Sequence, residues 1–296
     1  MNSTENIFIA HPGDTPIFFA DASIEAKTAG TCDLFLLLEQ TVIQLALKER
    51  RTGKLLAFEV LPIKDKKKTG WKNLLENTTT YSRILRNFEF LKVTAGIVSP
   101  EFTLIPEALF KQGDENIYFG KNFPLSKDKV IHVQHIPEFH LYTVFGIESE
   151  LDKELNHLFQ DPRLWHYSKA FLYGISMNAN ADDGKQLWLH IQLNKIDIIV
   201  SENKKLLLIN SFSWQTNEDI LYYTLFVCEQ LELNPEKFSL TITGEIEKGS
   251  VLYQLLSNYV LDINIPLNPS SFSPTLTIGD SPFHHHVILY NLALCE

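Results

Sequence analysis

The sequence predicts an α/β protein that contains two copies of one fold. The first observation is an internal repeat, because residues 34–58 and 187–209 contain the same succession of three short apolar segments. The offset, counted from 34 to 187, is 153 residues, and it falls to 151 where Leu55 aligns with Leu206 after a shorter turn. The second observation is that each copy continues into a helix and a further strand. A repeat this long is larger than a solenoid unit and indicates a duplicated domain.

Length and composition limit the class of protein. The chain has 296 residues, of which 45% are hydrophobic, which suffices for two cores of ordinary size. No segment approaches the ~20 apolar residues that cross a bilayer, and residues 1–6 lack the features of a signal peptide. We therefore expect a cytoplasmic protein without membrane insertion. Three cysteines far apart in the chain predict reduced structural thiols at Cys32, Cys228 and Cys295.

The charge argues against a nucleic-acid partner. The formal net charge is −10, whereas phosphate backbones are bound by clusters of Lys and Arg. The one basic run, residues 64–68, precedes a predicted helix. We interpret it as a solvated loop, with an electrostatic contact patch as the alternative.

Residues 1–21 are predicted to form an N-terminal arm with one edge strand, and residues 22–180 the first subdomain. Its meander combines strands at 33–39, 42–49 and 55–62, joined by short turns. The other elements expected in this half are a helix at 71–88, a strand at 92–99, a short helix at 106–110, strands at 130–133 and 140–147, and helices at 148–159 and from 162 to 175.

Residues 181–296 are predicted to form the second subdomain, after a polar linker at 178–184. Its meander covers residues 186–211. Thr216, with Asp219 three residues later, predicts a capped helix that runs through Leu233 and is buried against the sheet. The remaining expected elements are a strand at 238–243, a helix at 250–259, a strand at 261–265, a loop at 266–282 and a closing helix at 283–295.

The layout of each half resembles the ribonuclease-H-like fold, and two copies in one chain resemble actin-like ATPases. Those ATPases cradle phosphate with an Asp-x-Gly turn between the first two strands of each half, where glycine lets the backbone approach. The corresponding turns here are Glu39-Gln40-Thr41 and Gln192-Leu193-Asn194, and neither contains glycine. The nearest match to the nucleoside-binding turn is Gly244-Glu245, followed by a second acid at Glu247. Carboxylates beside that glycine would repel phosphate.

A nuclease of the ribonuclease-H-like class requires carboxylates on its central strands to hold Mg²⁺. The first strand, residues 34–38, has no acid in its interior, and His190 is the ionisable residue of its counterpart. The sequence therefore argues against a nuclease.

Histidines occur in two groups. His132 and His135 would face opposite sides of a strand, with His140 beyond the turn. In the run 284–286, consecutive side chains point in different directions, so at most two could share one metal. We interpret both groups as structural, and the pair Trp165-His166 as a packing anchor; no metal site is predicted.

Several separated segments resemble an uncharacterised bacterial family, domain of unknown function 3822. They are residues 102–110, 218–223, 230–235, 244–246 and 291–296, and the resemblance spans roughly residues 30–296. Membership implies an actin-like ATPase fold in a cytoplasmic bacterial protein. It implies no activity, substrate or catalytic residue. At the level of the fold, the arrangement also resembles actin-like components of pilus and secretion machines, which bind partner proteins.

These observations favour a non-catalytic interaction or scaffold protein, without cofactor, whose protein partner is unknown and whose homo-oligomerisation is open. The alternatives are an atypical nucleotide-binding ATPase and an enzyme whose site is assembled from distant residues. In a duplicated α/β protein the groove between the halves is the natural ligand site. We expect seven polar, acidic or glycine residues to border this groove: Glu39, Gln40, Thr41, Gln192, Asn194, Gly244 and Glu245. They suit a peptide or basic protein segment, unless they are ordinary solvent-facing turns.

Overall fold

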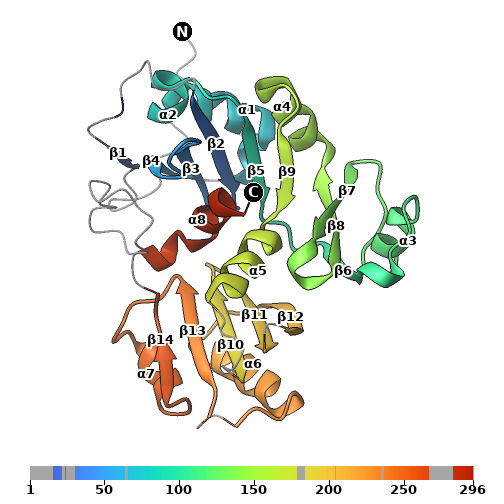
Figure 1. Ribbon diagram of the computed structural model, residues 1–296, viewed down its shortest axis with the longest axis vertical. Helices are drawn as coiled ribbons and strands as arrows, with labels where there is room; N and C mark the ends of the chain where they lie inside the picture. The colour runs from blue at the N-terminus through green and yellow to red at the C-terminus, as the bar shows by residue number, and fades with distance from the viewer. Residues whose placement is uncertain are drawn as a thin grey trace. The chain divides into compact units, whose positions relative to one another are not determined.

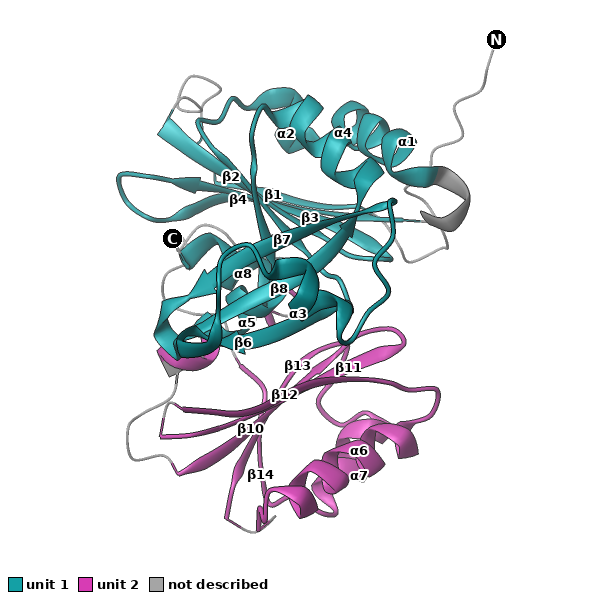
Figure 2. Ribbon diagram, turned by 90° about the vertical axis from the view of Figure 1, so that its right-hand side faces the viewer, with its two compact units in different colours: residues 1–173, 270–279, 288–296 teal, residues 174–269, 280–287 magenta. Residues whose placement is uncertain are grey.

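The computed structural model describes residues 16–21, 24, 31–63, 66–178, 184–203, 205–234, 237–266 and 283–295. These residues form two compact units (Figure 2). The first unit contains the described residues up to Tyr173 together with residues 288–295. The second contains those from Gly174 to 266 together with residues 283–287.

The first unit is built on a six-stranded sheet with the order β1-β4-β3-β2-β5-β9 (Figure 1). Its strands are β1 (Ile17–Ala20), β2 (Cys32–Leu38), β3 (Val42–Glu49), β4 (Leu55–Pro62), β5 (Val93–Ile97) and β9 (Arg163–His166). The strands β2, β3 and β4 form the expected antiparallel meander, and β5 and β9 continue the sheet in parallel. The predicted edge strand of the N-terminal arm is β1, which pairs with β4; residues 1–15 lie outside the described chain.

Three helices cover one face of this sheet: α1 (Lys66–Tyr81), α2 (Arg83–Asn87) and α4 (Ser149–Phe159) (Figure 2). Leu34 and Leu36 of β2 pack with Leu74 of α1 and Leu155 of α4 in one core. The prediction of a single helix at 71–88 was wrong in two respects. First, α1 begins earlier, at Lys66, and bends at Gly70, where φ is +69°. Second, α1 ends at Tyr81, and Ser82 is the N-cap of a separate helix, α2.

A three-stranded sheet, ordered β6-β8-β7, is inserted between β5 and β9. It contains β6 (Phe102–Pro106), β7 (Lys129–Ile136) and β8 (Leu141–Glu148), with α3 (Glu115–Gly120) packed beside it. The sequence predicted β7 and β8 but missed β6. The short helix expected from Pro106 is a 3₁₀ turn at Glu107–Leu109, and a second 3₁₀ turn at Pro137–Phe139 joins β7 to β8.

The helix expected from 162 to 175 is preceded by the unpredicted strand β9. The helix itself is α5 (Tyr167–Asn178), within which the chain passes from the first unit to the second. Most of the predicted linker, residues 179–183, lies outside the described residues.

The second unit is built on a five-stranded sheet with the order β12-β11-β10-β13-β14. Its strands are β10 (Lys185–Ile191), β11 (Lys195–Glu202), β12 (Lys205–Ser213), β13 (Ser239–Gly244) and β14 (Asp262–Asn264). The helices are α6 (Asn217–Gln230) and α7 (Val251–Ser257). As predicted, Thr216 forms a capping box with Asp219, and Ile220 and Val227 of α6 pack on the sheet.

The two sheets repeat each other in register, which confirms the predicted duplication. Cys32 pairs with Glu49 in the first meander, and Lys185 pairs with Glu202 in the second. Both meanders also carry a bulge at one equivalent point, after Leu47 in the first and after Val200 in the second. The meanders are separate sheets and not parts of one barrel.

The C-terminal segment contains a 3₁₀ turn (Phe283–His285) and α8 (Val287–Leu294). Sequence order suggested that the closing helix belongs to the second half, but residues 288–295 belong to the first unit. Leu292 packs against Gly96, and Lys48 Nζ donates a hydrogen bond of 2.5 Å to the Ala293 carbonyl. Since Leu34 and Leu36 face α1, the alternating residues Leu37 and Gly96 face α8 on the opposite side of the sheet.

The three cysteines are free and buried, in agreement with the predicted structural thiols. Burial raises the pKa of Cys228 to about 11 and that of Cys295 to about 12, so both thiols stay protonated at neutral pH. Among the helices that the structure describes, none is both long enough and apolar enough to cross a bilayer.

Candidate functional site

The first predicted site segment, Glu39-Gln40-Thr41, is the turn between β2 and β3. Gln44 Nε2 donates a 2.6 Å hydrogen bond to Glu39 Oε1, which ties the turn to β3. The Thr41 carbonyl accepts from the Ile63 N–H at 2.7 Å. The turn is thus closed by its own side chains and by the strand that follows.

The second predicted segment, Gln192-Leu193-Asn194, is the equivalent turn between β10 and β11. Trp214 donates from Nε1 to the Gln192 carbonyl at 2.9 Å and from its backbone N–H to the Asn194 carbonyl at 3.2 Å. Gln192 Nε2 lies 3.4 Å from Asp197 Oδ2. This turn is held by the segment after β12, so its carbonyls already have donors.

A carboxylate–amide pair occurs in both hairpins with the residue types exchanged. At positions related by the repeat, Glu39 faces Gln44 in the first hairpin, and Gln192 faces Asp197 in the second. Asp197 is buried, with Lys195 Nζ at 3.1 Å and Ser211 Oγ at 2.5 Å from Oδ1. The carboxylate is therefore neutralised within its own unit.

The third predicted segment, Gly244-Glu245, ends β13 beside Ile191. The backbone of Gly244 has φ +84°, and a Cβ at this position would lie 2.0 Å from the Ile191 carbonyl oxygen. The Glu245 N–H donates to that same oxygen at 2.9 Å. The glycine thus permits a close approach to the neighbouring strand, and the N–H beside it is already bound to protein.

The second unit therefore brings Gln192, Asn194, Gly244 and Glu245 to one end of its sheet, because Ile191 pairs with Gly244. Glu39, Gln40 and Thr41 end the equivalent hairpin of the first unit. That the two sets border a common groove stays a prediction.

His190 and Thr243 form a buried polar pair on neighbouring strands. His190 Nδ1 lies 2.9 Å from Thr243 Oγ1. Burial lowers the pKa of His190 to about 4, against the opposing charge of Asp197, so the ring is neutral at pH 7. A neutral, hydrogen-bonded histidine here stabilises the strand pairing and offers no carboxylate for Mg²⁺.

The two histidine groups differ in geometry. His132 and His135 face opposite sides as predicted: His132 Nε2 lies 2.9 Å from Asp152, and His135 Nε2 lies 3.4 Å from Glu107. His140 Nδ1 also contacts Glu107, at 3.1 Å. In the run 284–286, one nitrogen each of His284 and His285 and a carboxylate oxygen of Glu247 all lie within 4.8 Å of one another.

His166 agrees with the predicted packing anchor. It is fully buried on β9, and its Nε2 lies 2.9 Å from the Ser99 carbonyl, which accepts the hydrogen bond. Its Nδ1 lies 2.7 Å from Ser168 Oγ, and Phe102 packs against the ring. These contacts use both ring nitrogens within the protein.

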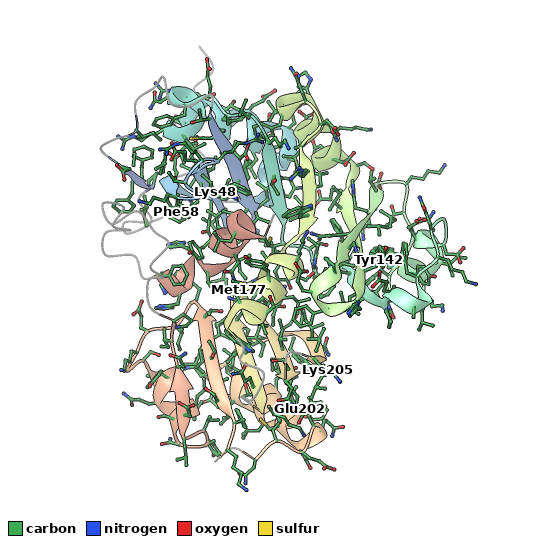
Figure 3. The ribbon with its side chains drawn as sticks, in the orientation of Figure 1. Lys48, Phe58, Tyr142, Met177, Glu202 and Lys205 are labelled. Atoms are coloured by element: carbon green, nitrogen blue, oxygen red, sulfur yellow. The ribbon has the colours of Figure 1, made fainter. Side chains whose placement is uncertain are left out.

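A basic pocket of about 600 Å³ in the first unit was not predicted. It opens where β2, β5 and β9 begin, at the end of the sheet opposite the Glu39 turn, and we define it by its lining residues: Asp33, Lys48, Arg50, Gly53, Lys92 and Arg163. Arg50 Nε contacts both carboxylate oxygens of Asp33, at 2.9 and 2.8 Å. Lys48, labelled in Figure 3, is almost fully buried over the Phe35 ring. The sequence contained one hint of this pocket, because a lysine in the otherwise apolar segment 42–49 is unusual. The other lining residues could not be predicted, because they come from separate strands and turns of the first unit.

The strand order of the two sheets can be compared with that of proteins of known structure. The topology is similar to that of a Bacteroides thetaiotaomicron protein described as having an actin-like ATPase fold and unknown function, with a TM-score of 0.77 and 22% identity, covering 93% of this chain and 100% of that one. It is also similar to the "PilM-PilN type IV pilus biogenesis complex", with a TM-score of 0.59 and 14% identity, covering 88% of this chain and 97% of that one. The protein has a duplicated ribonuclease-H-like fold, the fold of actin-like ATPases.

The family described as "Protein of unknown function (DUF3822)" matches residues 21–263, and the chain belongs to it. A comparison with curated proteins found no significant match.

Proposed function

We propose that this protein is a cytoplasmic, non-catalytic interaction protein that uses the actin-like fold to bind a partner protein. The observation that carries the proposal is the state of the three turns. The N–H groups of Glu39, Gln192 and Glu245 already donate to the carbonyls of Val42, Lys195 and Ile191, at 3.1, 2.8 and 2.9 Å. Phosphate cradles require free backbone N–H groups around a glycine, and these turns are instead closed on themselves.

The comparison with PilM supports the same proposal. That structure of the same fold is a complex of PilM with PilN, and it is an example of this fold in a complex with another protein. The chemistry of the partner follows from the turns, which contain the acidic residues Glu39 and Glu245. A basic peptide or protein segment fits these acids better than a phosphate does.

Two experiments test the proposal. Incubation with Mg-ATP should release no phosphate and leave the melting temperature unchanged, since tight native-state binding would raise it by several degrees. Phosphate release by the parent protein, or a clear rise in its melting temperature with Mg-ATP, would contradict the proposal.

Partner capture from the native cell, followed by an affinity measurement, supplies the second test. The combined variant Glu39→Gln, Asn194→Ala and Glu245→Gln should weaken the captured partner at an unchanged melting temperature. The matched control is Glu76→Gln with Glu229→Gln, which removes two exposed acids on helices. An unaltered affinity in the triple variant would move the docking surface elsewhere, with the acidic helix α4 tested next.

A second candidate function is the binding of an anionic small molecule in the basic pocket. Four cations and one carboxylate line this pocket in a protein whose net charge is −10. Among the described residues, no carboxylate pairs with the side chains of Lys92 or Arg163. Gathering like charges costs Coulomb energy that a phosphate- or carboxylate-bearing ligand would recover.

This second candidate predicts that pyrophosphate or citrate raises the melting temperature above that in sodium chloride of equal ionic strength. The double variant Lys92→Ala and Arg163→Ala should lose the effect. The control variant Lys111→Ala and Lys121→Ala removes two cations far along the chain from this pocket. An equal response in both variants would show non-specific charge screening and would reject the pocket as a site.

A further inference from the structure

Three metal-ligating side chains converge in the second unit from two segments that are distant in sequence. Glu247 follows β13, whereas His284 and His285 lie in the 3₁₀ turn before α8. One ring nitrogen from each histidine and one oxygen of Glu247 lie within 4.8 Å of one another. Within this group, His285 Nε2 and Glu247 Oε1 are 3.5 Å apart.

The tautomer of His284 is suited to a cation. Its Nε2 lies 2.6 Å from the Ile246 carbonyl and therefore acts as the N–H donor, which leaves the lone pair of the neutral ring on Nδ1. Metal-bound histidines commonly donate their other ring N–H to a backbone carbonyl, and this contact fixes the ring.

His285 supplies an independent observation. Its Nε2 is buried and lies 3.5 Å from Glu247 Oε1, but it makes no hydrogen bond to any part of the chain that the structure describes. Its ring meets the ring of His284 edge-on, with centroids 4.5 Å apart. This ring contact explains where the His285 ring lies. It does not satisfy the buried Nε2, and a buried polar atom without a hydrogen bond costs free energy unless a ligand binds it.

We propose that Glu247, His284 and His285 bind a divalent transition-metal cation, for which Zn²⁺ is the best match. Two imidazoles and one carboxylate are a common zinc ligand set, with water at the fourth position. Ligand atoms about 2.1 Å from a tetrahedral zinc ion lie about 3.4 Å apart, close to the distance between His285 and Glu247. Mg²⁺ and Ca²⁺ prefer ligand sets made only of oxygen.

The cation would fasten the turn after β13 to the segment that leads into α8. Glu247 is exposed and His284 is buried, so the site opens to solvent on the side of Glu247. The 3₁₀ turn already lies against β13, and ligand atoms that need small shifts can close around an ion. The cation is thus expected to stabilise the turn that contains Glu245, without a role in catalysis.

The test uses the full chain, purified without a metal-affinity tag and freed of metal with a chelator. Calorimetric titration with ZnCl₂ should show one equivalent bound, and the melting temperature should rise by several degrees. His285→Gln and, separately, Glu247→Gln should each weaken zinc binding at least tenfold. His284 is left intact because its hydrogen bond to Ile246 is part of the fold.

The matched control is His135→Gln, which removes a histidine that lies 3.4 Å from Glu107 in the other unit. It should bind zinc as the parent protein does, and MgCl₂ should produce no shift in either protein. Unchanged zinc affinity in Glu247→Gln, whose exposed side chain is not needed for folding, would overturn the proposal. Equal weakening in His135→Gln, or an equal response to MgCl₂, would also overturn it.

Discussion

The two sheets share their strand order, register and bulge, but they bury different chemistry at equivalent positions. Leu37 and Gly96 are neighbours in the first sheet, and Leu292 of α8 packs on them. At the same place, the second sheet has His190 and Thr243, joined by a polar contact. The duplication therefore preserves the backbone pattern and leaves the side chains to be determined by what packs on each face.

The ends of the two sheets differ in the same manner. Ile97 ends β5 and pairs with Leu38 in the first sheet, at the position where Gly244 pairs with Ile191 in the second. Ile97 is buried, whereas Gly244 turns sharply with a positive φ toward Ile191. Each half can thus serve as a reference for the other. Two of four substitution experiments use it in this way, and the four run from the largest expected effect to the smallest.

Gly244→Ala should have the largest effect. The new Cβ would overlap a backbone carbonyl at a left-handed φ, so we expect a loss of roughly 4 kcal/mol in the free energy of unfolding of the second unit. Urea denaturation measures this loss. Gly249→Ala is the control, because Gly249 has φ +88° but open space around it, and it should cost about 1 kcal/mol. Equal costs would mean that the contact with Ile191 is unimportant.

Acidification should weaken the second sheet through His190. In the unfolded chain, a histidine binds a proton below its ordinary pKa of 6.5, whereas folded His190 stays neutral down to about pH 4. Stability is therefore complete above pH 6.5 and is lost as the pH falls to 4, by about 3 kcal/mol from this residue. Hydrogen exchange at β10, compared with β2, resolves the two sheets. His190→Asn should flatten the pH dependence at β10, and an unchanged slope would assign the effect to other groups.

Glu59→Ala should destabilise the first unit by roughly 2–3 kcal/mol. The buried carboxylate accepts hydrogen bonds from Ser82 Oγ at 2.6 Å, from Arg83 N at 2.8 Å and from Ile84 N at 3.1 Å, and it thereby caps α2. The equivalent residue of the second sheet is exposed Asn210. Asn210→Ala should change stability by less than about 0.5 kcal/mol. Similar losses from both substitutions, measured by thermal unfolding, would contradict the special role of Glu59.

Thr216→Ala should have the smallest effect, about 1 kcal/mol, because it removes the side-chain acceptor of the capping box at α6. The neighbouring exposed residue provides the control Gln215→Ala, which should be close to neutral. Circular dichroism during denaturation measures both variants. A neutral Thr216→Ala would show that packing of α6 alone holds its first turn.

Local patterns made the correct predictions. The capping box at Thr216, the alternation in both meanders and the repeat offset all involve residues close together in the chain, so their physical causes are readable there. The four-residue strand β9 was missed because its apolar signal is short and its partner β5 lies far earlier in the chain. The break before α2 was missed because Glu59, which caps that helix, comes from β4.

The sequence by itself determined that this protein is a duplicated α/β chain whose two hairpin turns, Glu39-Gln40-Thr41 and Gln192-Leu193-Asn194, contain no glycine. Tertiary structure alone decided that α8 joins the first unit, that four cations line one pocket, and that Glu247 meets His284 and His285. The reason is physical: strand and helix periods depend on neighbours in the chain, whereas a pocket or ligand cluster depends on where distant segments pack. The burial of apolar surface drives that packing, and its free energy depends on the area buried and not on the order of the segments in the chain.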